Sequence, residues 1–133
     1  PKNNFWSVGI NKPVDNAAVN EFKILVQLDR KGLASSGNYR NFYEVDGKKY
    51  GHEINPNSGF PEMSQLLGVS VIANNCMDAD GYATAFMIMG LDKSRTFVET
   101  RPEIEACFIY TEDGQTLAID YSSGFKKHVR SEF

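Results

Sequence analysis

The chain has 133 residues, of which 41% are hydrophobic and 23% are charged, and its formal net charge at pH 7 is −3. This length is typical of one globular domain, so residues 1–133 are expected to form a single domain. The composition excludes intrinsic disorder and a disulfide-dense scaffold. The longest apolar run, residues 85–89, is far shorter than the ~20 residues that span a bilayer. With a net negative charge, no nucleic-acid partner is expected.

Strands are predicted wherever short apolar or alternating segments are bounded by turn residues. Asp46-Gly47 suits a type I′ turn of a hairpin, because both central residues of that turn need positive φ. Residues 55–61, with two prolines and a glycine, are predicted to be a loop. The predicted strands are residues 5–10, 22–28, 32–36, 39–45, 48–54, 67–73, 104–110 and 116–120.

Two helices are predicted in one block. The first begins near Met77 and ends at Gly90, and the second covers residues 93–100 with Asp92 as its cap. Beyond its first turn the first helix is so apolar that it is predicted to be buried on most sides. Meandering strands with two adjacent helices predict an α+β fold, a mainly antiparallel sheet with two helices packed on one face.

The two cysteines and the basic C-terminus carry no clear signal of a site. Cys76 and Cys107 lack the spacing of a zinc site and are expected to be buried thiols. The basic residues at 126–130 are expected to form a solvated tail rather than a phosphate-binding patch.

The first predicted helix carries the strongest chemical signal. Asp78 has a structural explanation, because an acid in the first turn favours the positive end of the helix dipole. Asp80 lies deeper, and Thr84 follows four residues later on the same helix face. Two oxygen ligands one turn apart suit Mg²⁺. Alternatively, Asp80 pairs with a loop and Thr84 bonds back to the Asp80 carbonyl, and spacing alone does not choose between these readings.

Two turns offer weaker candidates for ligand contacts. His52 precedes the loop at residues 55–61, where it is either a surface residue or a group that stacks on a planar ligand. The turn at residues 35–38 has small side chains that let a ligand approach the backbone. It lacks the following helix of a phosphate cradle. The sequence has no P-loop, dinucleotide fingerprint or Ser/His/Asp arrangement.

Taken in order, several segments resemble the C-terminal half of the ApbE family, the FAD:protein FMN transferases. Residues 6–13 (WSVGINKP) are similar to the family's W-x-V-G-I…P entry, and residues 33–39 (LASSGNY) to its T-S-G-D-Y segment. Residues 51–61 (GHEINPNSGFP) resemble its S-H-I-I-D-P-x-T-G-Y-P loop. Residues 69–85 (VSVIANNCMDADGYATA) resemble S-V-x-V-I-A…A-D-x-x-A-T-A, and the family's M-G follows at residues 89–90.

The resemblance implies a specific activity. Family members use Mg²⁺ to cleave FAD, attach FMN to a Ser or Thr hydroxyl of a target protein and release AMP. The acceptors are flavin-bearing subunits of membrane redox complexes, and many members are lipoproteins on the periplasmic side of the cytoplasmic membrane. Two alternatives on the same fold are an FAD pyrophosphatase that yields FMN and AMP, and a non-catalytic flavin-binding or interaction domain.

The resemblance also assigns residues. Asp80 and Thr84 match the family's magnesium ligands, and His52 and Ile54 match the loop that borders bound FAD. Ser36 and Gly37 match residues that line the site. Some members carry an extra acid where this chain has Ala83, so one metal ligand is expected to be missing or replaced by water.

A departure in the loop and a departure in length limit what carries over. The family's loop often has Asp where this chain has Asn55, which removes a charge there. Because the family runs to about twice this length, the chain is expected to be a C-terminal fragment with half of an active site. The lipid anchor and further flavin contacts are expected in the part that is absent.

Overall fold

The computed structural model describes residues 5–13, 21–38, 42–46, 48–51, 54–60 and 65–133. Its elements within these ranges are nine strands, two α-helices and one 3-10 helix. In chain order they are β1 (Trp6–Asn11), β2 (Phe22–Leu28), β3 (Gly32–Gly37), β4 (Phe42–Val45), β5 (Lys48–Gly51), β6 (Leu66–Ala73), α1 (Cys76–Met89), α2 (Leu91–Glu99), β7 (Glu105–Thr111), β8 (Leu117–Tyr121), η1 (Phe125–His128) and β9 (Val129–Glu132).

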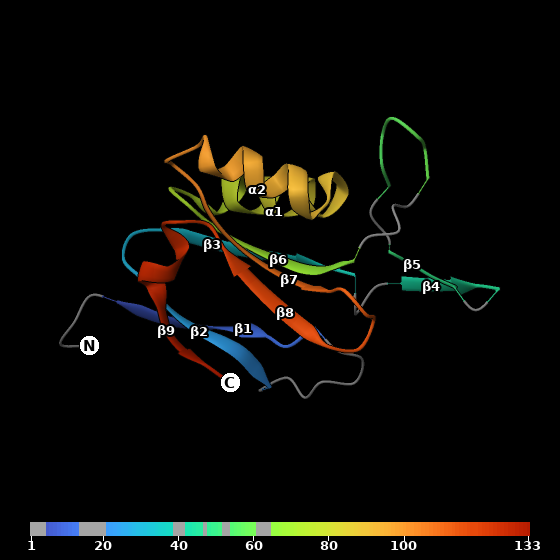
Figure 1. Ribbon diagram of the computed structural model, residues 1–133. Coiled ribbons are helices and arrows are strands. Elements are labelled where there is room, and N and C mark those ends of the chain that lie inside the picture. Colours follow the sequence, from blue (N-terminus) through green and yellow to red (C-terminus); the bar gives the residue numbers. More distant parts are fainter. Residues whose placement is uncertain (1–4, 14–20, 39–41, 47, 52–53, 61–64) are drawn as a thin grey trace.

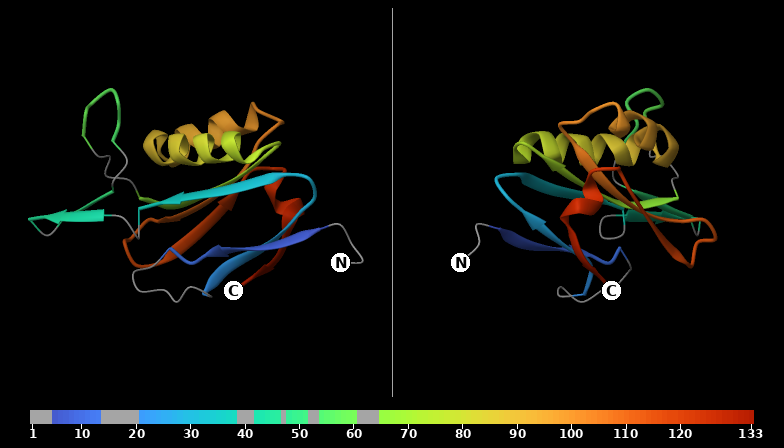
Figure 2. Two further views of the ribbon diagram at one scale, coloured as in Figure 1. Left: turned by 180° about the vertical axis from the view of Figure 1, so that it is seen from behind. Right: turned by 60° about the vertical axis from the view of Figure 1, so that its left-hand side comes forward.

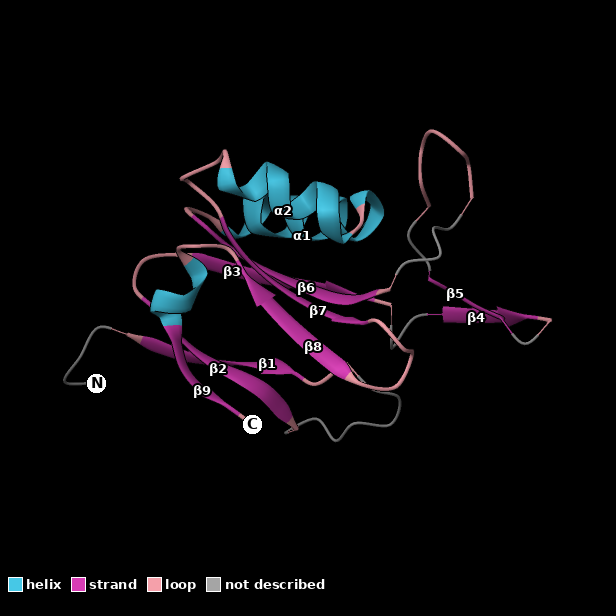
Figure 3. Cartoon of the chain, in the orientation of Figure 1, coloured by secondary structure: helices cyan, strands magenta, loops and turns pink. Residues whose placement is uncertain are grey.

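The described elements form three layers (Figure 1 and Figure 3). The middle layer is an antiparallel sheet with strand order β3-β6-β7-β8, and α1 and α2 cover one of its faces. A second antiparallel sheet, β1-β2-β9, lies against the other face, as both views of Figure 2 show. The β4-β5 hairpin extends to one side. The predicted α+β class with two helices on one face of a sheet is therefore confirmed, whereas the second sheet was not predicted.

Strand β6 is central because both of its faces and both of its edges are covered. It pairs with β3 on one side and with β7 on the other. Its alternate residues enter different cores: Val69 and Val71 pack under the helices, and Ile72 packs against the second sheet. A strand with two buried faces needs uncharged and mostly apolar residues, which explains why β6 carries no charged side chain.

The position of α1 on β3 is fixed where the helix begins. Asn75 caps it, since its Oδ1 accepts from the backbone N–H of Asp78 at 2.8 Å while its Nδ2 donates to the Asp78 carboxylate at 2.7 Å. Gly32 of β3 lies directly beneath, where a Cβ would be 2.5 Å from backbone atoms of Asn75 and Cys76. The structural interpretation of Asp78 is thus confirmed, and only glycine lets strand and helix approach this closely.

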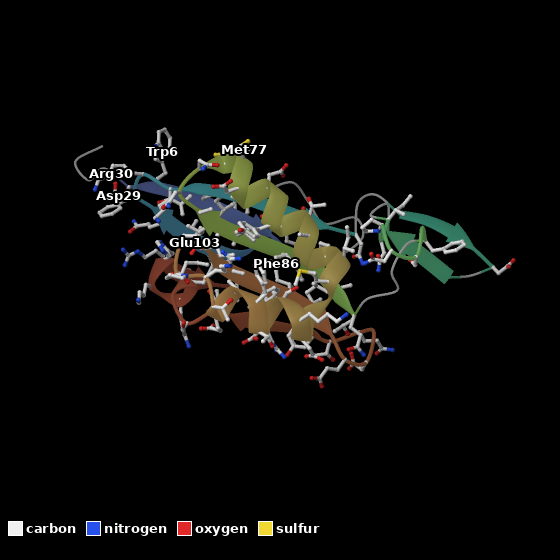
Figure 4. The ribbon with its side chains drawn as sticks, turned by 90° about the horizontal axis from the view of Figure 1, so that it is seen from above. Trp6, Asp29, Arg30, Met77, Phe86 and Glu103 are labelled. Carbon is white, nitrogen blue, oxygen red and sulfur yellow. The ribbon has the colours of Figure 1, made fainter. Side chains whose placement is uncertain are left out.

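Helix α1 is buried on one side only, so the prediction of burial on most sides is wrong. Ala79 and Ala83 face the sheet, and Phe86 packs edge-on against Phe97 of α2 at 5.9 Å between ring centroids. Figure 4 looks down on this layer and labels Phe86 within it. The opposite flank is open, and at the start of the helix the Met77 residue is 79% exposed.

Three further predictions need correction. Helix α2 begins at Leu91, directly after Gly90 with its φ of 78°, so Asp92 lies in the first turn and does not cap the helix. The basic C-terminus is not a loose tail, because β9 pairs with β2. Cys76 is exposed, and only Cys107 is buried.

No helix in the described part of the chain has the length and hydropathy to cross a membrane.

Candidate functional site

Asp80 and Thr84 lie on the open flank of α1. They are one turn apart, and both are exposed. On the opposite flank Tyr82 and Phe86 pack toward α2. Within the described ranges Asp80 forms no hydrogen bond and no ion pair. Its carboxylate is therefore available to a ligand.

Thr84 makes a contact that its place in a helix does not predict. Helical threonines commonly donate to the carbonyl four residues earlier, and the described structure contains no such bond from Thr84 to Asp80. Instead, Thr84 Oγ1 lies 3.1 Å from Ser36 Oγ of β3. The hydroxyl is held toward the sheet edge, and the back-bond to the Asp80 carbonyl, one of the two alternatives left open by the spacing, is absent from the described structure.

The Asp80 carboxylate and the Thr84 hydroxyl supply some, but not all, of the oxygen ligands that a hard cation needs. A carboxylate and a hydroxyl on one exposed helix face are the oxygen ligands that Mg²⁺ takes, and Mg²⁺ usually keeps several waters or substrate oxygens as well. Ala83 is fully buried against the sheet and offers no ligand. The described residues hold no group of three His, Cys, Asp or Glu side chains around a common point. Asp80 and Thr84 can thus supply two ligands, with the others coming from outside this pair.

Neighbouring residues of β3 face opposite sides of the sheet. Ser36 points toward α1, whereas Ser35 points to the other face, where its Oγ lies 2.7 Å from Ser70 Oγ. On that face a cleft of about 260 Å³ opens between β1 and β3, with Gly9, Ser35 and Ser70 in its lining. The predicted pair Ser36 and Gly37 ends β3 beside α1, and of the two only the Ser36 side chain reaches the α1 flank.

Residues 54–60 form a separate loop on the helix side of the main sheet (Figures 1 and 2). Ile54 in this loop is 57% exposed. The loop closes on itself, since Asn55 N–H donates to the Phe60 carbonyl at 3.0 Å and Asn57 N–H donates to Asn55 Oδ1 at 2.8 Å. Asn55 thus has a structural role in the turn. His52 lies outside the described residues.

Sequence reasoning missed the contact between Ser36 and Thr84. The two residues are 48 positions apart and belong to different kinds of element. No spacing rule connects them, and only the packing of α1 on β3 does.

Of the two cysteines, Cys107 has no role in this site, because burial raises the pKa of its thiol and keeps it protonated.

Comparison with known proteins places this geometry in a family. The model of the ApbE family matches residues 1–108. The FAD:protein FMN transferase of Escherichia coli K12 is 36% identical over 127 residues, which are 96% of this chain and 35% of that protein. The protein of the same name from Treponema pallidum is 34% identical and covers 79% of this chain and 28% of its own length. The chain belongs to the ApbE family.

Solved structures agree with the sequence matches. The apo flavinyl transferase ApbE of Pseudomonas stutzeri superposes with a TM-score of 0.74 and 34% identity over 96% of this chain and 38% of its own. The flavin transferase ApbE of Vibrio cholerae has a TM-score of 0.75 and 33% identity, over 92% and 37% of the two chains. The chain spans about a third of the length of the curated relatives it matches, less than the half that the resemblance led us to expect.

Proposed function

We propose that the protein containing this chain transfers FMN from FAD to a Ser or Thr hydroxyl of a target flavoprotein and releases AMP, with Mg²⁺ as cofactor. The observation that carries the proposal is the free Asp80 carboxylate one turn from the Thr84 hydroxyl on an exposed face of α1. The relatives named FAD:protein FMN transferase support the reaction class.

In the proposed reaction the bond between the FMN-side phosphorus and the oxygen that leads to AMP breaks. A new bond forms from that phosphorus to the acceptor oxygen, AMP leaves with the bridging oxygen, and the hydroxyl proton is released. Asp80 and Thr84 would hold Mg²⁺ from the open flank of α1. Bound there, Mg²⁺ would neutralise charge on the pyrophosphate.

Four further residues surround the bound ligands in this proposal. Ile54 and His52 border the flavin nucleotide, and Ser36 and Gly37 line the side of the site formed by β3. The exposed position of Ile54 leaves it accessible to such a ligand. The rigid end of β3 beside α1 gives the lining a fixed position relative to the proposed metal ligands.

The experiment uses the natural protein that contains this chain, at its full length. It is incubated with FAD, Mg²⁺ and a flavoprotein acceptor, and mass spectrometry measures the FMN adduct. The proposal expects an adduct that Asp80→Ala or EDTA abolishes and that Asp92→Ala, an acidic control on α2, preserves. Free FMN and AMP without an adduct would instead establish a pyrophosphatase, and uncleaved FAD would exclude both activities.

We also propose, from the resemblance alone, that the protein acts on the periplasmic side of the cytoplasmic membrane. A lipid anchor outside this chain would hold it there, close to a flavin-acceptor subunit of a membrane redox complex. Fractionation and external protease treatment of spheroplasts test this location. Recovery of the protein only with the cytosol would contradict it.

A further inference from the structure

We infer that Ser36 is a positioning residue that accepts the proton of Thr84 and thereby turns the Thr84 oxygen toward the metal. This inference rests on the proposed Mg²⁺ site at Asp80 and Thr84. It assigns Ser36 a task beyond lining the site, because the residue acts through Thr84 and not through contact with the metal or FAD. The observation behind it is the 3.1 Å contact between Ser36 Oγ and Thr84 Oγ1.

The chemistry of a hydroxyl ligand creates the need for such a partner. A threonine hydroxyl has one proton and two lone pairs, so when it binds a cation through a lone pair its proton must be donated elsewhere. Inside a helix the usual acceptor is the carbonyl four residues earlier. The described structure has no bond from Thr84 to the Asp80 carbonyl, and Ser36 Oγ is the oxygen at hydrogen-bonding distance instead.

Helix α2 provides the internal reference for the usual arrangement. Thr96 follows Asp92 by four residues, as Thr84 follows Asp80, and its Oγ1 donates to the Asp92 carbonyl at 3.1 Å. In that arrangement the hydroxyl proton is donated within the helix. In α1 the threonine at the same spacing instead contacts Ser36 of β3, so β3 determines the orientation of the Thr84 hydroxyl.

The position of Ser36 is well fixed. It lies opposite Val69 in the continuous ladder between β3 and β6, and its strand is held close to the start of α1 by the contact at Gly32. An acceptor on a paired strand has little freedom to move, which is what orientation of a metal ligand requires.

The test measures binding of Mn²⁺, as a probe for Mg²⁺, by electron paramagnetic resonance in the full-length natural protein. Ser36→Ala is expected to weaken Mn²⁺ binding about tenfold, the lower end of what loss of an outer-shell contact costs. Ser36→Thr keeps an acceptor oxygen and is expected to restore most of the affinity. Ser35→Ala is the matched control, because it removes the neighbouring hydroxyl on the other face of the same strand.

A double-mutant cycle decides whether Ser36 acts through Thr84. In a Thr84→Ala background, Ser36→Ala is expected to have no further effect on Mn²⁺ affinity. A full additional loss in that background would overturn the inference. So would weaker FAD binding by Ser36→Ala in EDTA, measured by flavin fluorescence, since that result would show direct contact with the nucleotide.

The outcomes also separate this inference from the proposed function. If the wild type binds Mn²⁺ and Asp80→Ala does not, the metal site stands, and equal affinities of Ser36→Ala and wild type would then refute only the role of Ser36. If the wild type binds no Mn²⁺ with or without FAD, the metal site is refuted and the role of Ser36 with it.

Discussion

Helices α1 and α2 each carry an aspartate followed four residues later by a threonine, but the two pairs have different surroundings. In α2, Asp92 lies 3.8 Å from the guanidinium of Arg95, and Thr96 bonds back to the Asp92 carbonyl. In α1, Asp80 has no partner among the described residues and Thr84 contacts β3. The same spacing thus places a carboxylate and a hydroxyl one turn apart in both helices, but it does not determine whether these groups already have partners.

Other polar side chains of α2 also have partners within the protein. Arg95 also forms an ion pair with Asp120 of β8 and lies over the ring of Tyr110 at 5.4 Å. At the end of the helix the Glu99 carboxylate accepts from the backbone N–H and the hydroxyl of Ser123. Arg95 and Glu99 thus attach α2 to β8 and to the turn before η1, whereas Asp80 on the open flank of α1 has no partner among the described residues.

The largest expected effect separates the two aspartates. Asp80→Asn is expected to reduce FMN transfer by about 100-fold or more. Loss of a residue that only supports a metal ligand costs up to about 100-fold, and loss of a direct ligand should cost at least as much. Asp92→Asn is expected to stay within about twofold, because Asp92 is exposed and its ion pair is weak. The rates of adduct formation by the two variants are measured side by side. Equal losses of activity would contradict the different roles of Asp80 and Asp92.

Substitutions at two glycines test how closely α1 packs against β3. Gly32→Ala is expected to lower the free energy of unfolding by about 1–3 kcal/mol, because its Cβ would collide with backbone atoms of Asn75 and Cys76. Gly81→Ala, in the open flank with nothing within 4 Å of the added Cβ, is expected to raise it by about 0.5–1 kcal/mol. Urea denaturation measures both. A neutral Gly32→Ala would mean that helix and strand are not tightly apposed.

A smaller, pH-dependent effect concerns the end of α2. The hydrogen bonds from Ser123 lower the pKa of Glu99 from 4.5, so this contact stabilises the fold above that pH and is lost as the pH falls through the lowered value. Ser123→Ala is therefore expected to cost about 0.5 kcal/mol at pH 7, since solvent screens an exposed pair. In denaturation curves the difference from wild type should shrink as the pH falls through the lowered pKa of Glu99. A difference that persists there would assign the effect to packing.

The smallest effect comes from giving α1 the ion pair that α2 has. Met77 is exposed three residues before Asp80, so Met77→Lys places an ammonium one turn away from the free carboxylate. Such pairs are worth about 0.2–0.5 kcal/mol, which predicts up to about twofold weaker Mn²⁺ binding at low salt. Met77→Gln is the uncharged control. An equal loss in both variants would trace the effect to the side chain's shape and not to its charge.

Much of the fold could be predicted because it depends on local rules. Strand β2 has the predicted bounds, the first helix ends at Gly90 as predicted, and the β4-β5 hairpin turns at Asp46 with a φ of 50°. Predictions failed where a segment depends on distant partners. Residues 129–132 form β9 because they pair with the edge of β2, and α1 is apolar although only one of its sides is buried.

The sequence alone predicts the α+β class and places Asp80 and Thr84 one turn apart on a helix, since periodicity and helical spacing are local properties of the chain. It left open whether that pair serves a ligand or only the helix. Only the tertiary structure shows how the pair is placed: α1 packs on β3 so that Thr84 contacts Ser36, and its open flank leaves Asp80 without a partner among the described residues. Contacts between residues far apart in sequence follow from the packing of whole elements, and no spacing rule contains them.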